Sequence, residues 1–153
     1  MKFNFFKKYH MIKFFKAVSL LMFVFILFSC NSKEKQDSYR DVVYRAVNDK
    51  DTAVLALKIS GKRFYGRYEI SYYKIGKDSG DVRGDIKENT LTGDFHFISN
   101  GGSWKRIPLA LLKKEDKLIL GNGVIGTYMN LPCFIQGTLN YNEPKFVFEE
   151  IQK

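Results

Sequence analysis

Few side chains of the sequence could carry out acid–base or metal chemistry. Of the two histidines, His96 follows Asp94 at a spacing that places both on one face of a strand. Such an Asp-x-His pair could bind a metal ion or polarise a water molecule, although an ordinary solvated face explains it equally well. Phosphate-binding glycine loops, nucleophile elbows and zinc-protease helices do not occur. We therefore assign no catalytic and no metal-binding residue and expect a non-enzymatic protein, with a hydrolase using unidentified carboxylates as the alternative.

Three acidic residues, Asp78, Asp81 and Asp85, flank a turn that the sequence predicts at 77–80. A calcium loop would need a denser set of oxygen ligands and a glutamate at a fixed later position. Neither occurs here, so we interpret the three carboxylates as parts of a solvated turn.

One row of side chains could form an interaction surface. Arg63, Tyr65, Arg67 and Tyr73 are predicted to point away from the core, and tyrosine and arginine are enriched at binding hot spots. Cross-strand pairing with acidic neighbours is the structural alternative. Trp104, after a glycine pair, is expected in the core or at the rim, with a barrel mouth as a further option.

The positive charge of the chain is concentrated at its N-terminus. The first 29 residues carry five lysines and no acidic residue, so they contribute +5 of the formal +9 and the rest contributes only +4. This distribution argues against nucleic-acid binding, which requires a basic stripe on the folded domain itself. After Lys16, residues 17–28 form a run of 12 residues that are apolar except for Ser19, shorter than the roughly 20 that span a bilayer. The pattern predicts a helical signal peptide.

The end of this apolar run, Leu27-Phe28-Ser29-Cys30, resembles the lipobox of bacterial lipoproteins. The resemblance implies cleavage between Ser29 and Cys30, a diacylglycerol on the Cys30 sulfur and an acyl chain on the new amino group. Phe28 departs from the small residue that is common there. The expected location is therefore an exported protein that is lipid-anchored to a bacterial membrane, the outer rather than the inner one.

These features divide the chain into three parts: signal peptide 1–29, lipidated cysteine and polar tether 30–38, and one domain 39–153. Lipidation would use the thiol of Cys30, which leaves Cys133 as the second and last cysteine. The domain is then expected to have no disulfide and no cofactor besides the covalent lipid. A lone cysteine in an apolar stretch, as Cys133 is, usually packs in a core.

Alternating apolar and polar residues dominate the rest of the chain, a pattern typical of half-buried strands. The clearest cases put residues 53, 55, 57 and 59 on one face, and then 64, 66, 68, 70 and 72. Residues 39–47 fit a strand or a short helix, and we favour the strand. The sequence therefore predicts an all-β domain, an antiparallel meander of eight to ten strands that forms a small lipocalin-like barrel or a barrel-like sandwich.

A glycine two residues before a large apolar side chain recurs five times, at Gly66, Gly84, Gly93, Gly126 and Gly137. Glycine weakens a strand by roughly 0.5 to 1 kcal/mol relative to alanine. Its repeated use therefore indicates positions where the sheet bends or where neighbours approach closely.

The segment from Asp51 to Gly121 resembles small uncharacterised lipoproteins of Bacteroidota. The residues that carry the likeness are Asp51-Thr52-Ala53-x-Leu55, Gly84-Asp85-Ile86-Lys87, Phe95-x-Phe97-x-Ser99-x-Gly101 and the run 111–114. The resemblance implies the fold and the location rather than an activity. We thus expect a membrane-anchored binding module, whose ligand is a small apolar molecule in the barrel lumen or another envelope protein on the outer face. An inhibitor of a cell-wall hydrolase is a specific variant of this hypothesis.

Overall fold

The computed structural model describes residues 40–151, which belong to one compact unit, Asp37–Lys153. These residues form ten strands and, within that range, no helix, so the predicted all-β fold is confirmed. The strands are β1 (Arg40–Asn48), β2 (Asp51–Ser60), β3 (Arg63–Tyr72), β4 (Gly76–Lys87), β5 (Thr90–Ile98), β6 (Trp104–Lys114), β7 (Lys117–Leu120), β8 (Ile125–Tyr128), β9 (Leu131–Phe134) and β10 (Val147–Glu150). The predicted signal peptide, the lipobox and the tether lie outside the described residues.

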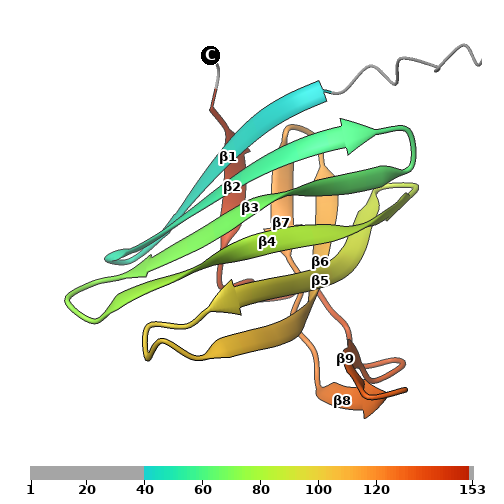
Figure 1. Cartoon of the computed structure of the whole chain (residues 1–153). Helices are drawn as coiled ribbons and strands as arrows, with labels where there is room; N and C mark the ends of the chain where they lie inside the picture. Colours follow the sequence, from blue (N-terminus) through green and yellow to red (C-terminus); the bar gives the residue numbers. More distant parts are fainter. Residues whose placement is uncertain (1–39, 152–153) are drawn as a thin grey trace, which may run out of the picture. The chain divides into compact units, whose positions relative to one another are not determined.

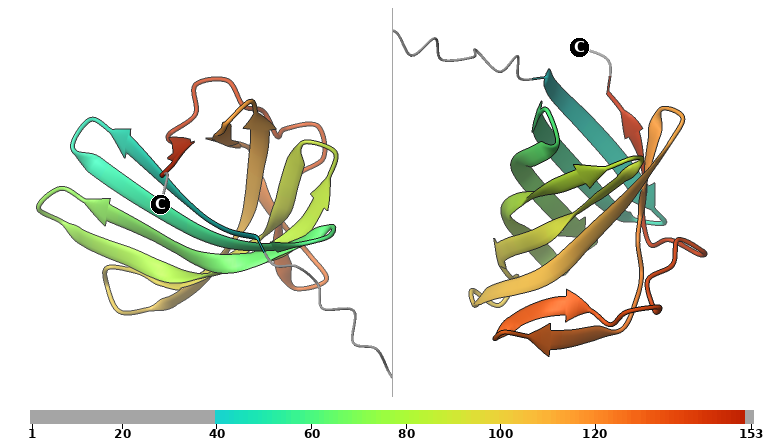
Figure 2. Two further views of the ribbon diagram at one scale, coloured as in Figure 1. Left: turned by 90° about the horizontal axis from the view of Figure 1, so that it is seen from above. Right: turned by 90° about the vertical axis from the view of Figure 1, so that its right-hand side faces the viewer.

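Eight of the strands close into an antiparallel barrel (Figure 1). Strands β1 to β7 follow one another around the wall as a meander, and β10 returns to pair with both β7 and β1. The remaining strands, β8 and β9, form a separate hairpin outside the barrel (Figure 2). The predicted meander therefore closes, but the segment between β7 and β10 interrupts it. This segment, residues 121–146, is called the excursion below.

The alternating pattern selects the side chains that fill the barrel. In β2 every second residue from Ala53 to Leu57 is buried, and β3 continues with Phe64, Tyr68 and Ile70. Residues 40–48 form the strand that we favoured over a helix. Each of these strands has one apolar face, so closing the barrel removes all of these faces from water at once.

Aromatic rings occupy the lumen. The Tyr68 ring on β3 lies 4.7 Å from Phe95 on β5 and 5.8 Å from Phe148 on β10, measured between centroids. Phe97 stacks on Phe95 at 4.3 Å, and Phe146 lies 6.0 Å from Phe148. Because β3 and β10 are three steps apart around the wall, these contacts cross the interior. The lumen at this level is thus packed with the protein's own side chains.

Two segment predictions were wrong. The turn predicted at 77–80 lies earlier, at 73–75, where Lys74 takes a positive φ of 58°. Gly76, with a φ of 144°, follows this turn and begins β4. Residues 77–80 instead belong to β4, and Asp78 accepts hydrogen bonds from the Tyr72 hydroxyl (3.0 Å) and the Asn100 amide (2.8 Å). The sequence pattern from Phe134 to Tyr141 also predicts a strand, but β9 ends at Phe134 and a turn follows at 136–138. At residues 77–80, a polar residue of a type that favours turns instead accepts hydrogen bonds from β3 and from the β5–β6 loop.

We expect Tyr68→Phe to raise the free energy of unfolding by about 1 kcal/mol. The Tyr68 hydroxyl is buried without a hydrogen-bond partner among residues 40–151, and burial raises the pKa of this phenol. An unsatisfied buried hydroxyl costs roughly 1 to 3 kcal/mol, so its removal should stabilise the fold. Urea denaturation of the protein measures the change.

Tyr72→Phe is the matched control for Tyr68→Phe. It removes a hydroxyl that does donate a hydrogen bond, to Asp78. This variant should lose about 1 kcal/mol. If Tyr68→Phe lost as much, the Tyr68 hydroxyl would have a partner, and our view of the lumen would be wrong.

Candidate functional site

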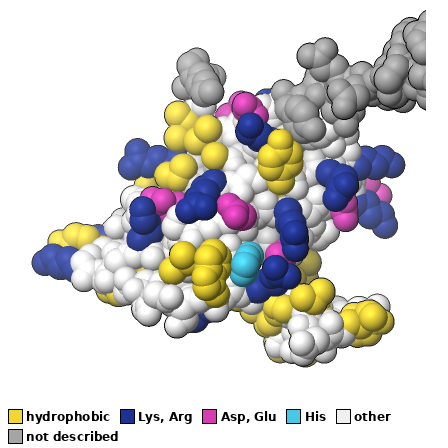
Figure 3. Space-filling model, viewed as in Figure 1, with side chains coloured by type: hydrophobic (Ala, Val, Ile, Leu, Met, Phe, Trp, Pro, Cys, Tyr) yellow, Lys and Arg dark blue, Asp and Glu magenta, His cyan; other side chains and the backbone are white. Residues whose placement is uncertain are grey.

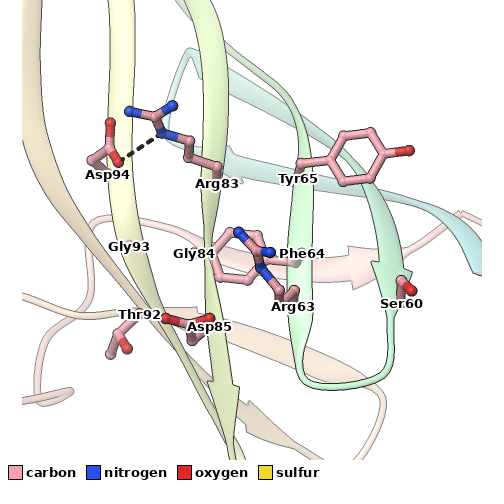
Figure 4. Close-up of a pocket in the computed structure, with 10 residues that line it drawn as sticks. All are labelled: Ser60, Arg63, Phe64, Tyr65, Arg83, Gly84, Asp85, Thr92, Gly93 and Asp94. Carbon is pink, nitrogen blue, oxygen red and sulfur yellow. Dashed lines mark hydrogen bonds and ion pairs between the residues drawn. The ribbon is translucent and has the colours of Figure 1, made fainter.

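A depression of about 650 Å³ lies on the outer wall where β3, β4 and β5 run side by side (Figure 4). Gly84 on β4 faces Gly93 on β5 across the strand pair, and both glycines line the depression. Phe64 lines it as well, and its ring lies behind Gly84 in the view of Figure 4. The floor is therefore backbone and aromatic ring rather than polar side chains.

Glycine is required at these two positions because the strands approach closely there. A Cβ atom on Gly84 would overlap the carbonyl oxygen of Thr92, and a Cβ on Gly93 would overlap that of Arg83. Gly66 on β3 meets the same constraint, against the carbonyl of Ala56. Three of the five repeated glycines thus permit tight packing of the wall, as the sequence predicts, while Gly126 and Gly137 belong to the excursion.

The rim of the depression carries charged groups with and without partners. Arg83 Nε lies 3.3 Å from one Asp94 oxygen, and Arg106 Nε lies 3.4 Å from the other. Arg63 and Asp85, by contrast, form no ion pair with any residue from 40 to 151. Exposed ion pairs add little stability. Because the guanidinium of Arg63 has no ion-pair partner among these residues, it is the group at the rim most able to bind an external anion or carboxylate.

The four predicted interaction residues do not form one surface. Arg63 and Tyr65 line the depression. Arg67 instead forms an ion pair with Asp81 at 3.2 Å and donates a hydrogen bond to the Ser79 hydroxyl at 3.0 Å. This is the cross-strand pairing that the sequence indicates as the alternative to an interaction surface. Tyr73 lies in the turn between β3 and β4, where Lys50 and Lys74 approach its ring.

The Asp94–His96 pair does not form a metal centre in the structure. Asp94 is held by the two arginines, and the His96 ring stacks on Trp104 at 4.7 Å between centroids. Trp104 itself is exposed at the start of β6, so it lies at the rim rather than in the core. No group of three or more His, Cys, Asp or Glu side chains within residues 40–151 is arranged to hold a metal ion.

The remaining acidic and cysteine candidates lie in different surroundings from those expected. Asp78, Asp81 and Asp85 are spread along β4 rather than around a turn. Burial and, to a smaller extent, the hydrogen bond to Asp78 raise the pKa of Tyr72 to about 12.

Cys133 is half-buried on β9, outside the barrel core, because the excursion rather than the barrel contains its strand. Cys30 and Ser29 lie outside the described residues.

A feature that the sequence interpretation missed is the apolar surface of the β8–β9 hairpin. The exposed large apolar side chains of the excursion are Val124, Ile125, Tyr128, Met129, Leu131 and Ile135. The signal was present in the sequence, because no charged residue occurs between Leu118 and Asn142. The alternating pattern of the run nevertheless predicts strands with a buried face.

The fold and the depression together define a class: a small closed antiparallel barrel with a packed lumen and a concave site on its outer wall. Comparisons of the chain with protein-family models, with curated proteins and with solved structures found no match. Within residues 40–151, no helix has the length and apolar character needed to cross a membrane.

Proposed function

We propose that the chain is an exported lipoprotein, anchored through an acylated Cys30, whose barrel binds another envelope protein at the outer-wall depression. The observation that carries this proposal is the contrast between the two candidate sites. Aromatic rings occupy the lumen, which disfavours a small apolar ligand there. The depression combines a glycine floor, an exposed tyrosine and an unpaired arginine, a combination suited to a protein partner.

The chemistry of the rim indicates what the partner would present. A guanidinium binds a carboxylate through parallel hydrogen bonds, and the ring of Tyr65 adds apolar contact area. A loop with an aspartate or glutamate at its tip would therefore fit the depression. A cell-wall hydrolase is one partner within this class.

Hydrolysis by carboxylates is less well supported than binding. A glycoside hydrolase of the common type uses one carboxylic acid and one free carboxylate. Arg83 and Arg106 hold Asp94 in ion pairs, which leaves Asp85 as the other carboxylate at the site. The arrangement therefore favours a site that binds over one that transfers protons.

Photo-crosslinking in the intact cell envelope tests the binding site. We expect a benzoylphenylalanine at Thr92, on the rim, to form a discrete adduct with a second protein. The same group at Val147, exposed on β10, should form none. Arg63→Ala should reduce the Thr92 adduct about tenfold, which corresponds to a loss of about 1.4 kcal/mol of binding energy.

Arg40→Ala is the matched control for Arg63→Ala, because Arg40 is an exposed arginine on β1 that pairs with Glu150. It should leave the Thr92 adduct unchanged. Equal adducts from Thr92 and Val147, or an adduct that survives Arg63→Ala, would show that the depression is not the binding site.

A further inference from the structure

The excursion between β7 and β10 is the least charged part of the protein. Charged residues make up 27% of the chain, yet the 25 residues from Leu118 to Asn142 contain none. The β8–β9 hairpin lies in the middle of this run. Six large apolar side chains of the segment are exposed, and a cluster of this kind without charged residues is typical of a contact surface.

The root of the excursion is fixed to the outside of the barrel. Asn122 and Asn140 exchange backbone hydrogen bonds of 2.8 Å, and the Ile135 amide donates to the Val124 carbonyl at 2.8 Å. Gly121 is closely surrounded by the side chains of Leu139, Tyr141 and Ala110. Ala110 points outward from β6 and is nevertheless buried. The root therefore covers β6 and holds the hairpin in a defined position.

The tip of the hairpin projects from this root with its apolar side chains in the open. Met129 and Asn130 take positive φ values of 48° and 63°, which make a tight two-residue hairpin turn. Tyr128, Met129 and Leu131 around this turn are 70%, 79% and 52% exposed. Figure 3 shows yellow apolar side chains gathered at the lower right, where Figure 1 places the hairpin.

Apolar groups are exposed on both faces of the hairpin as well as at its tip. Tyr128 pairs with Leu131, so both point to one face, whereas Ile125 pairs with Phe134 and points to the other. Ile125 is half exposed. A hairpin that docks flat on a protein would expose one apolar face and pack the other. Exposure all round fits insertion into a medium that surrounds the tip.

We propose that the β8–β9 tip inserts into the surface of the lipid bilayer that carries the anchor. This inference rests on the proposed function, because the lipid on Cys30 is what keeps the barrel beside a membrane. A segment without charges enters the headgroup region with no cost of burying an ion. Tyrosine is enriched at this depth, since its ring is apolar and its hydroxyl stays hydrated.

The length of the tether permits this contact. The nine residues from Asn31 to Tyr39 span at most about 30 Å. Arg40 starts β1 at the barrel end where the β6–β7 turn lies, and the excursion leaves β7 at the opposite end. A strand of ten residues, such as β2, is about 33 Å long. The tether can therefore extend over a distance similar to the length of a barrel strand. When the strands run roughly parallel to the bilayer surface, the anchor and the tip can contact the same bilayer.

Quenching of a single tryptophan by brominated lipids tests the insertion. The acylated protein carries Trp104→Phe, which removes the one native tryptophan, together with Tyr128→Trp. It is reconstituted into vesicles of phosphatidylethanolamine and phosphatidylglycerol, with and without brominated acyl chains. We expect blue-shifted emission that the brominated lipid lowers about twofold, as for an apolar side chain at the acyl boundary.

Tyr73→Trp in the same background is the matched control, because Tyr73 is also an exposed tyrosine, in the β3–β4 turn. It should not be quenched. Leu131→Asp, added to Tyr128→Trp, should abolish the quenching while circular dichroism stays unchanged. An unquenched Tyr128→Trp protein, or equal quenching of the Tyr128→Trp and Tyr73→Trp proteins, would overturn the proposal, as would disulfide-linked dimers of a Met129→Cys variant in the vesicles. Failure of the anchor itself is detected separately, by the absence of acyl label on the wild-type chain.

Discussion

Gly93→Val is expected to lower the free energy of unfolding by about 3 kcal/mol, the upper end of the usual range for overpacking. Gly93 on β5 lies opposite Gly84 on β4. A Cβ on Gly93 would overlap the Arg83 carbonyl oxygen and would lie 2.7 Å from the Gly84 Cα. Both neighbours are backbone atoms of a paired strand, so relief requires the wall to move rather than one side chain to rotate.

The change should appear as a lower urea midpoint and a melting temperature reduced by roughly 10 °C or more. Gly101→Val is the matched control, since a Cβ on Gly101 meets no atom within 4 Å. That variant should stay within about 0.5 kcal/mol of the parent. A Gly93→Val protein as stable as the Gly101→Val protein would show that the repeated glycines have no packing role.

Most of the barrel could be predicted from the sequence because burial in a sheet follows a period of two. The inward positions of β2 and β3 were readable as alternating residues, and the turns at 61–62, 88–89 and 115–116 as short polar interruptions. The inward glycines indicate a strongly curled sheet, which leaves a barrel and a barrel-like sandwich open, and the structure shows the closed barrel. Local pattern and tertiary structure agree at these elements.

The errors occurred where long-range contacts decide the outcome. Residues 77–80 have the composition of a turn, but Asp78 satisfies groups from Tyr72 and Asn100, the latter 22 residues away. The excursion was misinterpreted for a related reason. An apolar residue in an alternating run is normally buried, and only the structure shows that the partner strand β9 leaves Tyr128 and Leu131 exposed.

The candidate site was only partly predictable. Arg63 and Tyr65 were readable as outward residues, and both line the depression. The depression itself depends on the register that sets Gly84 opposite Gly93, which no single strand reveals. The register between β3 and β4 pairs Arg67 with Asp81 and so removes Arg67 from the interaction surface.

Cys30→Ser is expected to abolish lipid attachment completely, because the sulfur is the atom to which the diacylglycerol would be bound. Each buried methylene contributes about 0.8 kcal/mol to membrane affinity, and stable anchoring takes more than one chain. The variant should therefore remain an uncleaved or mislocalised precursor. Cys133→Ser is the matched control, since it removes the other cysteine of the chain and leaves the lipobox intact.

Incorporation of radiolabelled palmitate tests the proposed anchorage most directly. The wild-type chain and Cys133→Ser should carry the label and sediment with membranes, and Cys30→Ser should carry none. Label that persists on Cys30→Ser, or a wild-type chain that never acquires label, would contradict the assignment of this barrel to a lipid-anchored envelope protein.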